Sequence, residues 1–419
     1  MITLGVTIDR IGGTVIAVDD TEVQYAISVQ RGRATFTDQG AASTMRLNLL
    51  LGPPQDANYL RGSTVGNTIT LSMYDAASVG HGRFRGQITD IELAHPQDQP
   101  ARALITAVGA LAQLNGRAVG YTDFPEQDVR ARIIDVGARV GVPVQVNTTG
   151  PAPTLAVYDA QDQRASTVMQ EAASSVGGML FDTPDGEVVF QQHADRANLQ
   201  GAMQSHGLWQ ENPQSWKVTP GTWLGYATGG VAPTLTLPCE TVIYEPTWRQ
   251  FSGALANDIR VEYAGGQVKV TDSESQAAYG QRSVALQTSL AHKDDALDRA
   301  ADVSRAFGTP RYMMDQVQII MDRLPADVFD DITQHEIIGR RVMVTDLPQP
   351  APATSFIGIC EGVTEDYAPG RWTMTLALTP QQFSYAMLAW EEPDPSIRWM
   401  DATCSWEEAI RIDDLTRSA

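Results

Sequence analysis

Apolar and polar residues alternate with a period of two along the first 115 residues, which is the pattern of β-strands with one buried face. Clusters of Gly, Pro and Asp separate the alternating runs and are typical of turns. Short strands at such close spacing predict a small antiparallel barrel or sandwich. The predicted strands are 14–18, 23–29, 43–51, 67–74, 83–93 and 102–109.

The middle of the chain changes to the periodicity of helices. In 124–143 and 159–178, apolar residues recur every three or four positions, and glycines follow the last of them. Segment 179–192 then has the pattern of a hairpin that turns at Thr-Pro-Asp-Gly. We therefore expect a small α+β domain over 116–195, followed by an irregular connection over 196–239.

Strand patterns return in 240–385 and predict a second antiparallel barrel, with one helix inserted at 289–307. Asp294 and Asp295 favour the N-terminal end of that helix, because acidic side chains there stabilise the helix dipole. The predicted strands of this region lie in 240–246, 257–272, 311–322, 340–347, 355–367 and 371–380.

One pattern, F-x-G-x-Φ-x-x-Φ with Φ an apolar residue, occurs in both strand-rich regions. Around the two copies, the order of strands and the lengths of loops agree over about 60 residues. We interpret this agreement as an internal duplication of one barrel. The alternative is that two unrelated antiparallel barrels share these features by chance. The matching residues are Phe84, Gly86, Ile88 and Ile91 in the first region and Phe356, Gly358, Cys360 and Val363 in the second, 356 − 84 = 272 positions later.

These patterns predict an α+β chain that is mainly β. Two similar antiparallel β-barrel domains flank a small α+β domain, and an extended C-terminal arm follows. Three copies of such a chain would supply six equivalent barrels, and closed cyclic symmetry would arrange a homotrimer as a pseudo-sixfold ring. The expected parts are a first tube-like barrel at 1–115, the α+β domain at 116–195, the connection at 196–239, a second tube-like barrel at 240–385 and the arm at 386–419.

The layout resembles that of baseplate hub or tail-tip minor tail proteins of tailed bacteriophages. Three features carry the resemblance: the paired hairpins at Phe84 and Phe356, the segment STVMQEAASSVGGMLFDTPDGEVVF (166–190), and the closing hairpin EGVTEDYAPGRWTMTLALTP (361–380). The middle segment is similar to a helix, Gly-Gly, strand, turn and strand element of such hubs. The resemblance covers about residues 1–385.

The resemblance implies a structural virion protein at the tail tip, made and assembled in the host cytoplasm. Such a hub joins the sixfold tail tube to the threefold tip, forms part of the DNA channel and takes part in DNA ejection. The implied partners are further copies in a homotrimer, a tail tube or distal tail protein ring, the tape-measure protein, and tail fibre or receptor-binding proteins. Double-stranded DNA would pass through the lumen without specific binding.

Charge and composition agree with this reading. The net charge of −20 argues against a protein that binds nucleic acid tightly, because phosphate binding needs clustered Lys and Arg. An acidic surface suits a channel in which a polyanion must slide. The three cysteines form no CxxC pair and indicate synthesis in a reducing compartment. The longest apolar run, 103–114, is too short to span a bilayer, so we expect no direct membrane insertion.

Motifs for chemistry are weak. The six histidines make no HExxH pattern, and the chain has no G-x-S-x-G, P-loop or G-x-G-x-x-G. We therefore expect no catalytic residue, no metal ligand and no cofactor, and we expect that the protein is not an enzyme. Two alternatives remain: a tail-associated enzyme that degrades polysaccharide or peptidoglycan, and a distal tail or secretion-spike component. Acid pairs that could serve such an enzyme are Asp19-Asp20, Asp294-Asp295, Asp330-Asp331 and Glu391-Glu392.

The arm at 386–419 differs in composition from the rest of the chain. Trp390, Trp399 and Trp406 lie among acids and prolines. These three residues are the interaction candidates, because aromatic anchors dominate protein interfaces. They either pack back on the second barrel or dock into a neighbouring subunit or another tail protein.

Overall fold

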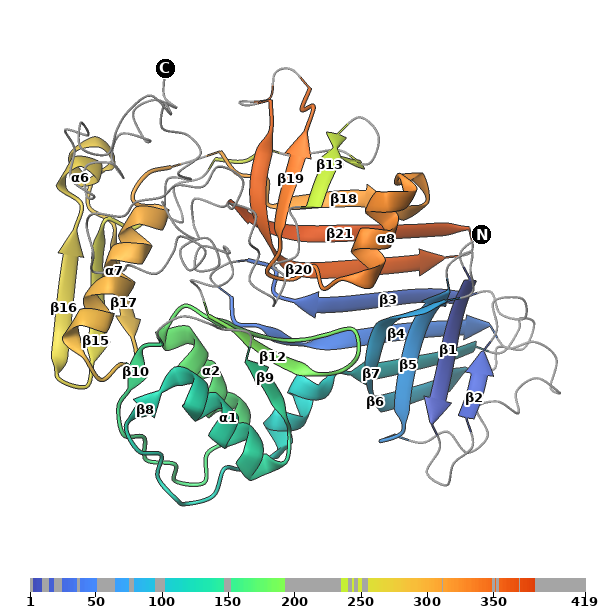
Figure 1. Cartoon of the computed structure of the whole chain (residues 1–419), viewed down its shortest axis with the longest axis horizontal. Coiled ribbons are helices and arrows are strands. Elements are labelled where there is room, and N and C mark those ends of the chain that lie inside the picture. The colour runs from blue at the N-terminus through green and yellow to red at the C-terminus, as the bar shows by residue number, and fades with distance from the viewer. Residues whose placement is uncertain are drawn as a thin grey trace, which may run out of the picture.

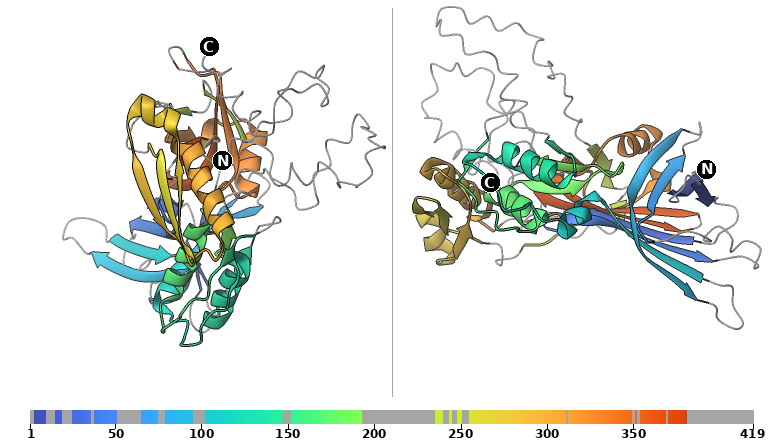
Figure 2. Two further views of the ribbon diagram at one scale, coloured as in Figure 1. Left: turned by 90° about the vertical axis from the view of Figure 1, so that its left-hand side faces the viewer. Right: turned by 90° about the horizontal axis from the view of Figure 1, so that it is seen from below.

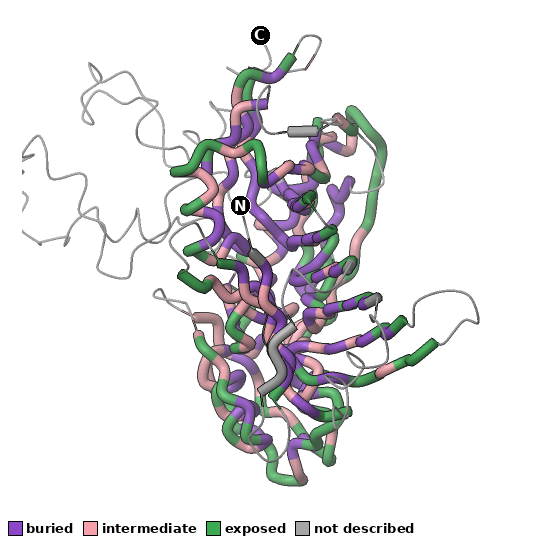
Figure 3. The backbone as a smooth tube through the Cα atoms, turned by 90° about the vertical axis from the view of Figure 1, so that its right-hand side faces the viewer, coloured by how far each residue is buried: buried purple, intermediate pink, exposed green. Residues whose placement is uncertain are grey.

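The computed structural model describes most of the chain, and one 13-stranded sheet dominates it (Figure 1). Buried residues alternate with more exposed ones along its strands, as Figure 3 marks in purple and green. The described residues are 3–9, 15–18, 25–35, 38–50, 65–74, 79–94, 102–146, 152–192, 235–239, 243–244, 248–250, 255–310, 312–348, 351, 354–368 and 370–380.

The N-terminal region supplies the first half of the sheet. Its strands are β1 (Thr3–Asp9), β2 (Val15–Val18), β3 (Tyr25–Gly32), β4 (Ala41–Leu50), β5 (Thr68–Tyr74), β6 (Gly80–Ala94) and β7 (Arg102–Val108). They lie in the order β3-β4-β7-β6-β5-β1-β2, and each neighbouring pair is antiparallel. The alternation of apolar residues therefore located six of these strands correctly and missed β1.

The C-terminal region supplies the second half. Its strands are β13 (Leu235–Pro238), β14 (Ile243–Tyr244), β18 (Gln316–Ile320), β19 (Arg341–Thr345), β20 (Phe356–Ala368) and β21 (Arg371–Pro380). They lie in the order β14-β18-β21-β20, with β19 paired to β20 and β13 paired to β19. Between β18 and β19 come a 3-10 turn, η4 (Met321–Arg323), and helix α8 (Ala326–Gln334).

The two halves repeat one strand order. Position by position, β3-β4-β7-β6-β5-β1 corresponds to β14-β18-β21-β20-β19-β13. A β-bulge interrupts β6 between Ile88 and Asp90, and another interrupts β20 between Cys360 and Gly362. Both bulges directly follow the third residue of the repeated sequence pattern. One difference is that β13 runs parallel to β19, whereas β1 is antiparallel to β5. The repeat seen in the sequence is therefore also a repeat of backbone topology.

The repeated glycine has a steric reason in both halves. A Cβ atom on Gly86 would lie 2.6 Å from the ring of Phe84 and 2.3 Å from the carbonyl oxygen of Val108. On Gly358 it would lie 2.9 Å from the ring of Phe356 and 3.2 Å from the carbonyl oxygen of Thr379. Each phenylalanine ring thus packs against the backbone two residues further along, at a position where only glycine fits.

Strand β20 joins the halves, because it pairs antiparallel with β3. The long strands β18, β21, β20, β3, β4, β7 and β6 form one layer, while β5 and β1 cross in front of its end (Figure 1). Figure 2 shows the curl of the sheet from below. The fold is mainly β with helices, as predicted, but two separate barrels are not confirmed. The 13 strands of the two halves form one continuous curled sheet, since backbone pairing runs through the boundary between the halves.

The predicted helices and hairpin form a first α+β unit. Asp128 caps its first helix by accepting a bond from the Ala131 amide, so the helix begins later than the Pro125 start that the sequence indicated. Gly141 ends that helix with a left-handed backbone, at φ 66°. The unit contains η2 (Ala110–Gly116), β8 (Gln127–Asp128), α1 (Val129–Val140), β9 (Val144–Val146), β10 (Thr154–Leu155), α2 (Ala165–Ser175), β11 (Met179–Asp182) and β12 (Val188–Gln191).

A second α+β unit lies within the region predicted as the second barrel. Its three strands form a separate sheet, β16-β15-β17, and helix α7 packs on β15 and β16. It shares one apolar core with the first unit, and the two lie beside each other in Figure 1. The elements are β15 (Asp258–Tyr263), β16 (Gly266–Thr271), α6 (Ser273–Tyr279), β17 (Ser283–Gln287) and α7 (Lys293–Phe307).

Two predicted parts lie mostly outside the described residues. These are the connection at 196–239, of which only 235–239 is described, and the arm at 386–419 with Trp390, Trp399 and Trp406. Within the described part of the chain, no helix is both long enough and apolar enough to cross a membrane.

Candidate functional site

The site of greatest interest is the joint at which the two halves of the sheet meet. The first residues of β20, Phe356–Ile359, pair with β19 of their own half. Its later residues pair with β3 of the other half, from Gly362 opposite Gly32 to Tyr367 opposite Ile27. One strand therefore belongs to both halves, and its register fixes how they sit side by side.

Two glycines allow the backbones to approach at this joint. Gly32 has a φ of +81°, which L-residues with a Cβ rarely adopt. A Cβ on Gly32 would lie 2.4 Å from the carbonyl oxygen of Glu361 and 2.7 Å from the Cα of Gly362. A Cβ on Gly362 would in turn lie 2.4 Å from the carbonyl oxygen of Arg33. The close pairing of β3 with β20 thus depends on glycine on both sides.

Buried charges cross between the halves beneath the joint. Arg83 of β6 binds Glu365 of β20 through two bonds, Nε to Oε2 at 3.0 Å and Nη2 to Oε1 at 2.6 Å. The Tyr367 hydroxyl donates to the same carboxylate. Arg83 and Glu365 are both almost fully buried, and the Arg83 guanidinium lies 5.6 Å from the centre of the Trp372 ring.

Two further ion pairs follow the same polarity. Arg31 Nη1 lies 2.8 Å from Glu336 Oε2, and Arg33 Nε lies 2.8 Å from Glu361 Oε2. In all three pairs, the first half supplies the arginine and the second half supplies the glutamate. The joint is therefore complementary in charge. The positive side chains of the first half bind the negative side chains of the second, so two identical halves would not form these pairs. Buried ion pairs of this kind specify a partner more than they add net stability.

The pKa shifts of the central pair favour its ionised form. Burial alone would raise the pKa of Glu365, but Arg83 and, at 3.9 Å, Arg31 hold it below its ordinary value. Burial opposes the charge of Arg83, yet the Glu365 carboxylate raises the arginine pKa overall. Burial and the same carboxylate raise the pKa of Tyr367, so its hydroxyl keeps its proton.

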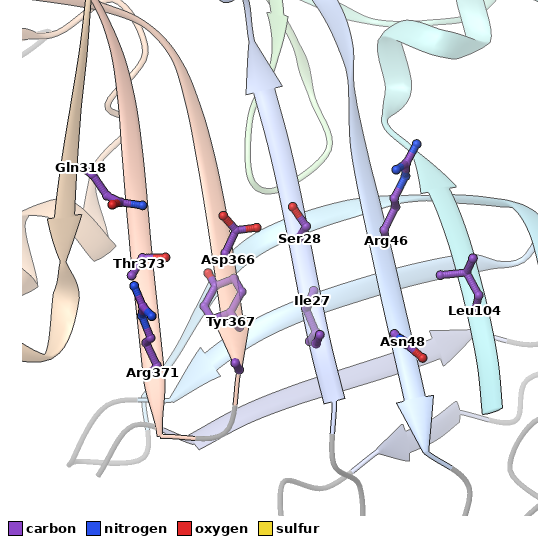
Figure 4. A pocket seen from close by; sticks show the side chains of 12 residues that line it. Ile27, Ser28, Arg46, Asn48, Leu104, Gln318, Asp366, Tyr367, Arg371 and Thr373 are labelled. Carbon is purple, nitrogen blue, oxygen red and sulfur yellow. The ribbon is translucent and has the colours of Figure 1, made fainter. Parts of the chain in front are cut away.

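The other face of the joint carries mainly uncharged polar side chains. Figure 4 shows a depression there that spans strands from β18 to β7. Gln318, Thr375, Thr364, Gln30 and Thr44 stand opposite one another in a row across five strands. Among the described residues that line the depression, Asp366 is the only acid, beside Arg46 and Arg371. This face therefore presents hydrogen-bond donors and acceptors to solvent, and its own net charge is small.

A buried carboxylate fastens the first α+β unit to the sheet. Asp182 of β11 accepts bonds from the Ser43 amide at 2.7 Å, the Ser43 hydroxyl at 2.9 Å and the Leu111 amide at 2.7 Å. Burial raises the pKa of Asp182, and the bonds from Ser43 and Leu111 oppose that rise. The residue links β4, η2 and β11 at one point.

Replacing Asp182 with Asn is expected to lower the free energy of unfolding by about 1–3 kcal/mol, because an amide group cannot accept all three donated bonds. Urea denaturation followed by circular dichroism measures the loss. Asp185→Asn is the matched control, since Asp185 is exposed in the nearby turn. Equal stability of the two variants would show that Asp182 does not anchor the unit.

Where the acid pairs raised for enzymatic chemistry are described, Asp295 and Asp331 make structural contacts. No group of three His, Cys, Asp or Glu side chains able to hold a metal ion occurs in the described part of the chain. Asp295 lies in the first turn of α7 and accepts a bond from the Thr154 amide. Asp331 pairs with Arg340 and His335. Asp19-Asp20 and Glu391-Glu392 lie outside the described residues.

Sequence reasoning missed the buried ion pairs, although a signal was present. Arg31 follows Ile27 and Val29 on the buried face of β3, and Glu365 stands between Val363 and Tyr367 on β20. A charged residue at an apolar position of an alternating strand needs a buried partner of opposite charge. The pattern indicates that a partner exists, but it does not say which one.

The fold of this chain is similar to that of solved tail proteins, two of them from prophages. The 43 kDa tail protein of prophage MuSo2 from Shewanella oneidensis matches with a TM-score of 0.57 and 12% identity, over 91% of this chain and 99% of that one. A tail protein from Neisseria meningitidis matches with a TM-score of 0.57 and 12% identity, over 91% and 98% of the two chains. Prophage tail protein gp18 from Listeria monocytogenes matches with a TM-score of 0.50 and 8% identity, over 90% and 94%.

Comparisons of sequence alone find no such relationship. No known family of sequences matches the chain, and no curated protein does. At 8–12% identity, the solved structures show a shared fold. The resemblance to phage tail proteins that the sequence indicated is thus confirmed by the fold.

Proposed function

We propose that the protein is a structural, non-enzymatic hub at the tip of a phage tail, where it joins the sixfold tail tube to a threefold tip. The observation that carries this proposal is the repeated strand order, with the two copies joined side by side through β20 and β3. A threefold part must offer six equivalent contacts to sit on a sixfold tube. Two equivalent halves in each of three copies supply that number.

The polar face of the joint, which has few charged side chains, suits the wall of a DNA channel. Tight binding of DNA requires clustered Lys and Arg, and each phosphate contact strengthens the grip. The depression across the joint instead has Ser28, Asn48, Gln318 and Thr373, and its charged residues are two separate arginines, Arg46 and Arg371, with Asp366 between them in strand order. We therefore place this face toward the lumen, where DNA would pass without being held.

The remaining partners follow from the same placement. The tail tube or distal tail ring would contact one end of the ring, and tail fibre or receptor-binding proteins the other. The tape-measure protein would end in the lumen. Trp390, Trp399 and Trp406 would dock the arm on a neighbouring subunit or tail protein. The protein would reside in the virion, at the tail tip.

Native mass measurement of the full chain tests the hub. The expected result is a complex of three times the 45.5 kDa chain mass, because three copies complete the pseudo-sixfold ring. Dilution should dissociate it to monomers without unfolding them. A stable hexamer would contradict the proposal, since six copies would present twelve halves and no longer match a sixfold tube.

A further inference from the structure

Among the described strands, β6 and β14 each have an unpaired edge that corresponds to one side of the internal joint. Strand β6 pairs with β5 through Gly80–Gln87 and with β7 through Gln87–Ala94. In the described part of the chain, no strand covers Asp90–Ala94 on the side away from β7. At the other end of the described sheet, β14 pairs with β18 alone. Strand β6 corresponds to β20, and β14 corresponds to β3. The open edges are therefore the counterparts of the two strands that meet in the joint.

The internal repeat gives a register for these edges. In β6, the bulge places Asp90 where Gly362 lies in β20, an offset of 362 − 90 = 272. In β14, Ile243 occupies the place of Tyr25 in β3, an offset of 243 − 25 = 218, because each stands opposite the corresponding residue of the next strand.

The isolated bridge at Arg249 has the same register as β14. The bridge between Arg249 and Met313 has the same spacing as the pair Ile243 and Ile319, since 249 + 313 = 243 + 319. Arg249 therefore corresponds to Arg31 of the joint. Its neighbours Trp248 and Gln250 correspond to Gln30 and Gly32.

We propose that the open edge of β6 pairs antiparallel with Trp248–Gln250 of a second copy of this chain. Asp90 stands opposite Gln250, Ile91 opposite Arg249 and Glu92 opposite Trp248 of that copy. The arrangement repeats the β20–β3 joint between molecules, and three copies then contain three internal joints and three joints between chains. This inference rests on the proposed hub and names the contact that closes its ring.

The exposure of Leu93 at the open edge of β6 fits a second copy. Leu93 of β6 is 52% exposed, whereas Glu365 at the same position of β20 is fully buried by the joint. A neighbouring chain would remove this apolar side chain from water. In this register Arg249 shares a face of the paired strands with Ile91 and Leu93, and it forms an ion pair with Asp315 of its own chain at 3.4 Å.

The two edges also differ from each other, so the contact is heterologous. A heterologous contact closes into a ring only when its rotation divides a full turn. The internal joint sets that rotation, because it already relates the two halves of one chain. A second copy is therefore the occupant that the geometry selects.

Cysteine cross-linking of the full chain tests the register. Asp90→Cys and Gln250→Cys are combined in a Cys404→Ser background and treated with a short bismaleimide. The expected product is a covalent dimer and trimer on a denaturing gel. Thr364→Cys with Gln30→Cys is the positive control, because it crosses the internal joint and should cross-link within one chain. Asp90→Cys with Tyr121→Cys is the matched negative control, since Tyr121 is 80% exposed.

A second variant measures the contact without a cross-link. Leu93→Asp is expected to weaken association by about tenfold or more in native mass titrations, while the melting curve of the monomer stays unchanged. A trimer that forms without the 90–250 cross-link, and that Leu93→Asp does not weaken, would overturn this contact and leave the hub intact. A chain that stays monomeric and forms no cross-link at any concentration would contradict both.

Discussion

Replacing Glu365 with Gln is expected to lower the free energy of unfolding by about 3–5 kcal/mol, because the substitution leaves Arg83 charged and buried without its partner. The Arg83–Glu365 pair is bidentate and almost fully removed from water. Arg31 loses a negative charge 3.9 Å away, and the Tyr367 hydroxyl loses its charged acceptor. Urea denaturation followed by tryptophan fluorescence measures the loss, since Trp372 lies against Arg83.

Two further variants make this result specific to the ion pair. Asp366→Asn changes the next residue on the exposed face of β20 and should alter stability by less than about 0.5 kcal/mol. Replacing both partners, as in Arg83→Met with Glu365→Met, should recover most of the loss, because no unpaired charge remains. A single variant as stable as the parent would show that the pair does not hold the halves together.

The same pair predicts a dependence on pH. The pKa of Glu365 is lowered in the folded protein, so its contribution is complete above the unfolded value of about 4.3 and disappears as the pH falls through the folded value. The parent protein should therefore lose stability in acid, and the Glu365→Gln variant should lose less over the same range. Parallel acid titrations of the two proteins would show the difference.

Replacing Gly32 with Ala is expected to open the joint and to cost about 3 kcal/mol. The positive φ of Gly32 disfavours any residue with a Cβ. The added carbon would also overlap the backbone of β20 at Glu361 and Gly362. Hydrogen exchange of β3 and β20 should accelerate, because their shared backbone bonds would be weakened.

Gly116→Ala is the matched control for this substitution. A Cβ at Gly116 meets no atom within 4 Å, and its φ lies outside the left-handed region. Its stability should equal or slightly exceed that of the parent, because alanine restricts the unfolded chain. Protection of β3 that is equal in the Gly32 and Gly116 variants would show that the two strands tolerate a wider spacing.

The sequence predicted those features that depend on local periodicity. The alternation around Phe84 and Phe356 located both repeated strands, because a strand with one buried face shows it in every second residue. The same reasoning found α1 and α2 and the hairpin that follows them. It missed β1, although TLGVTID (3–9) alternates in the same way.

Features that depend on distant pairing could not be predicted in this way. Alternation identifies Val29 and Val363 as core residues, but it does not say that β3 and β20 are neighbours. The two halves were therefore expected as separate barrels. Arg83 and Glu365 lie 282 positions apart, and nothing local in either strand names the other. Assigning such a pair requires the register of the whole sheet.

The position shared by Glu365 and Leu93 has a consequence for how the duplicated halves diverged. Within one chain, the tether keeps β3 and β20 at a high effective concentration, so their joint forms as the chain folds. Desolvated charges could accumulate there after duplication, because their partners are always present. The edge of β6 is exposed to solvent until a second chain binds. A charged residue there would have to be desolvated at each binding event, whereas the burial of a leucine favours binding. On the proposed assembly, the covalent linkage between the halves explains why β20 carries a carboxylate at this position and β6 carries a leucine.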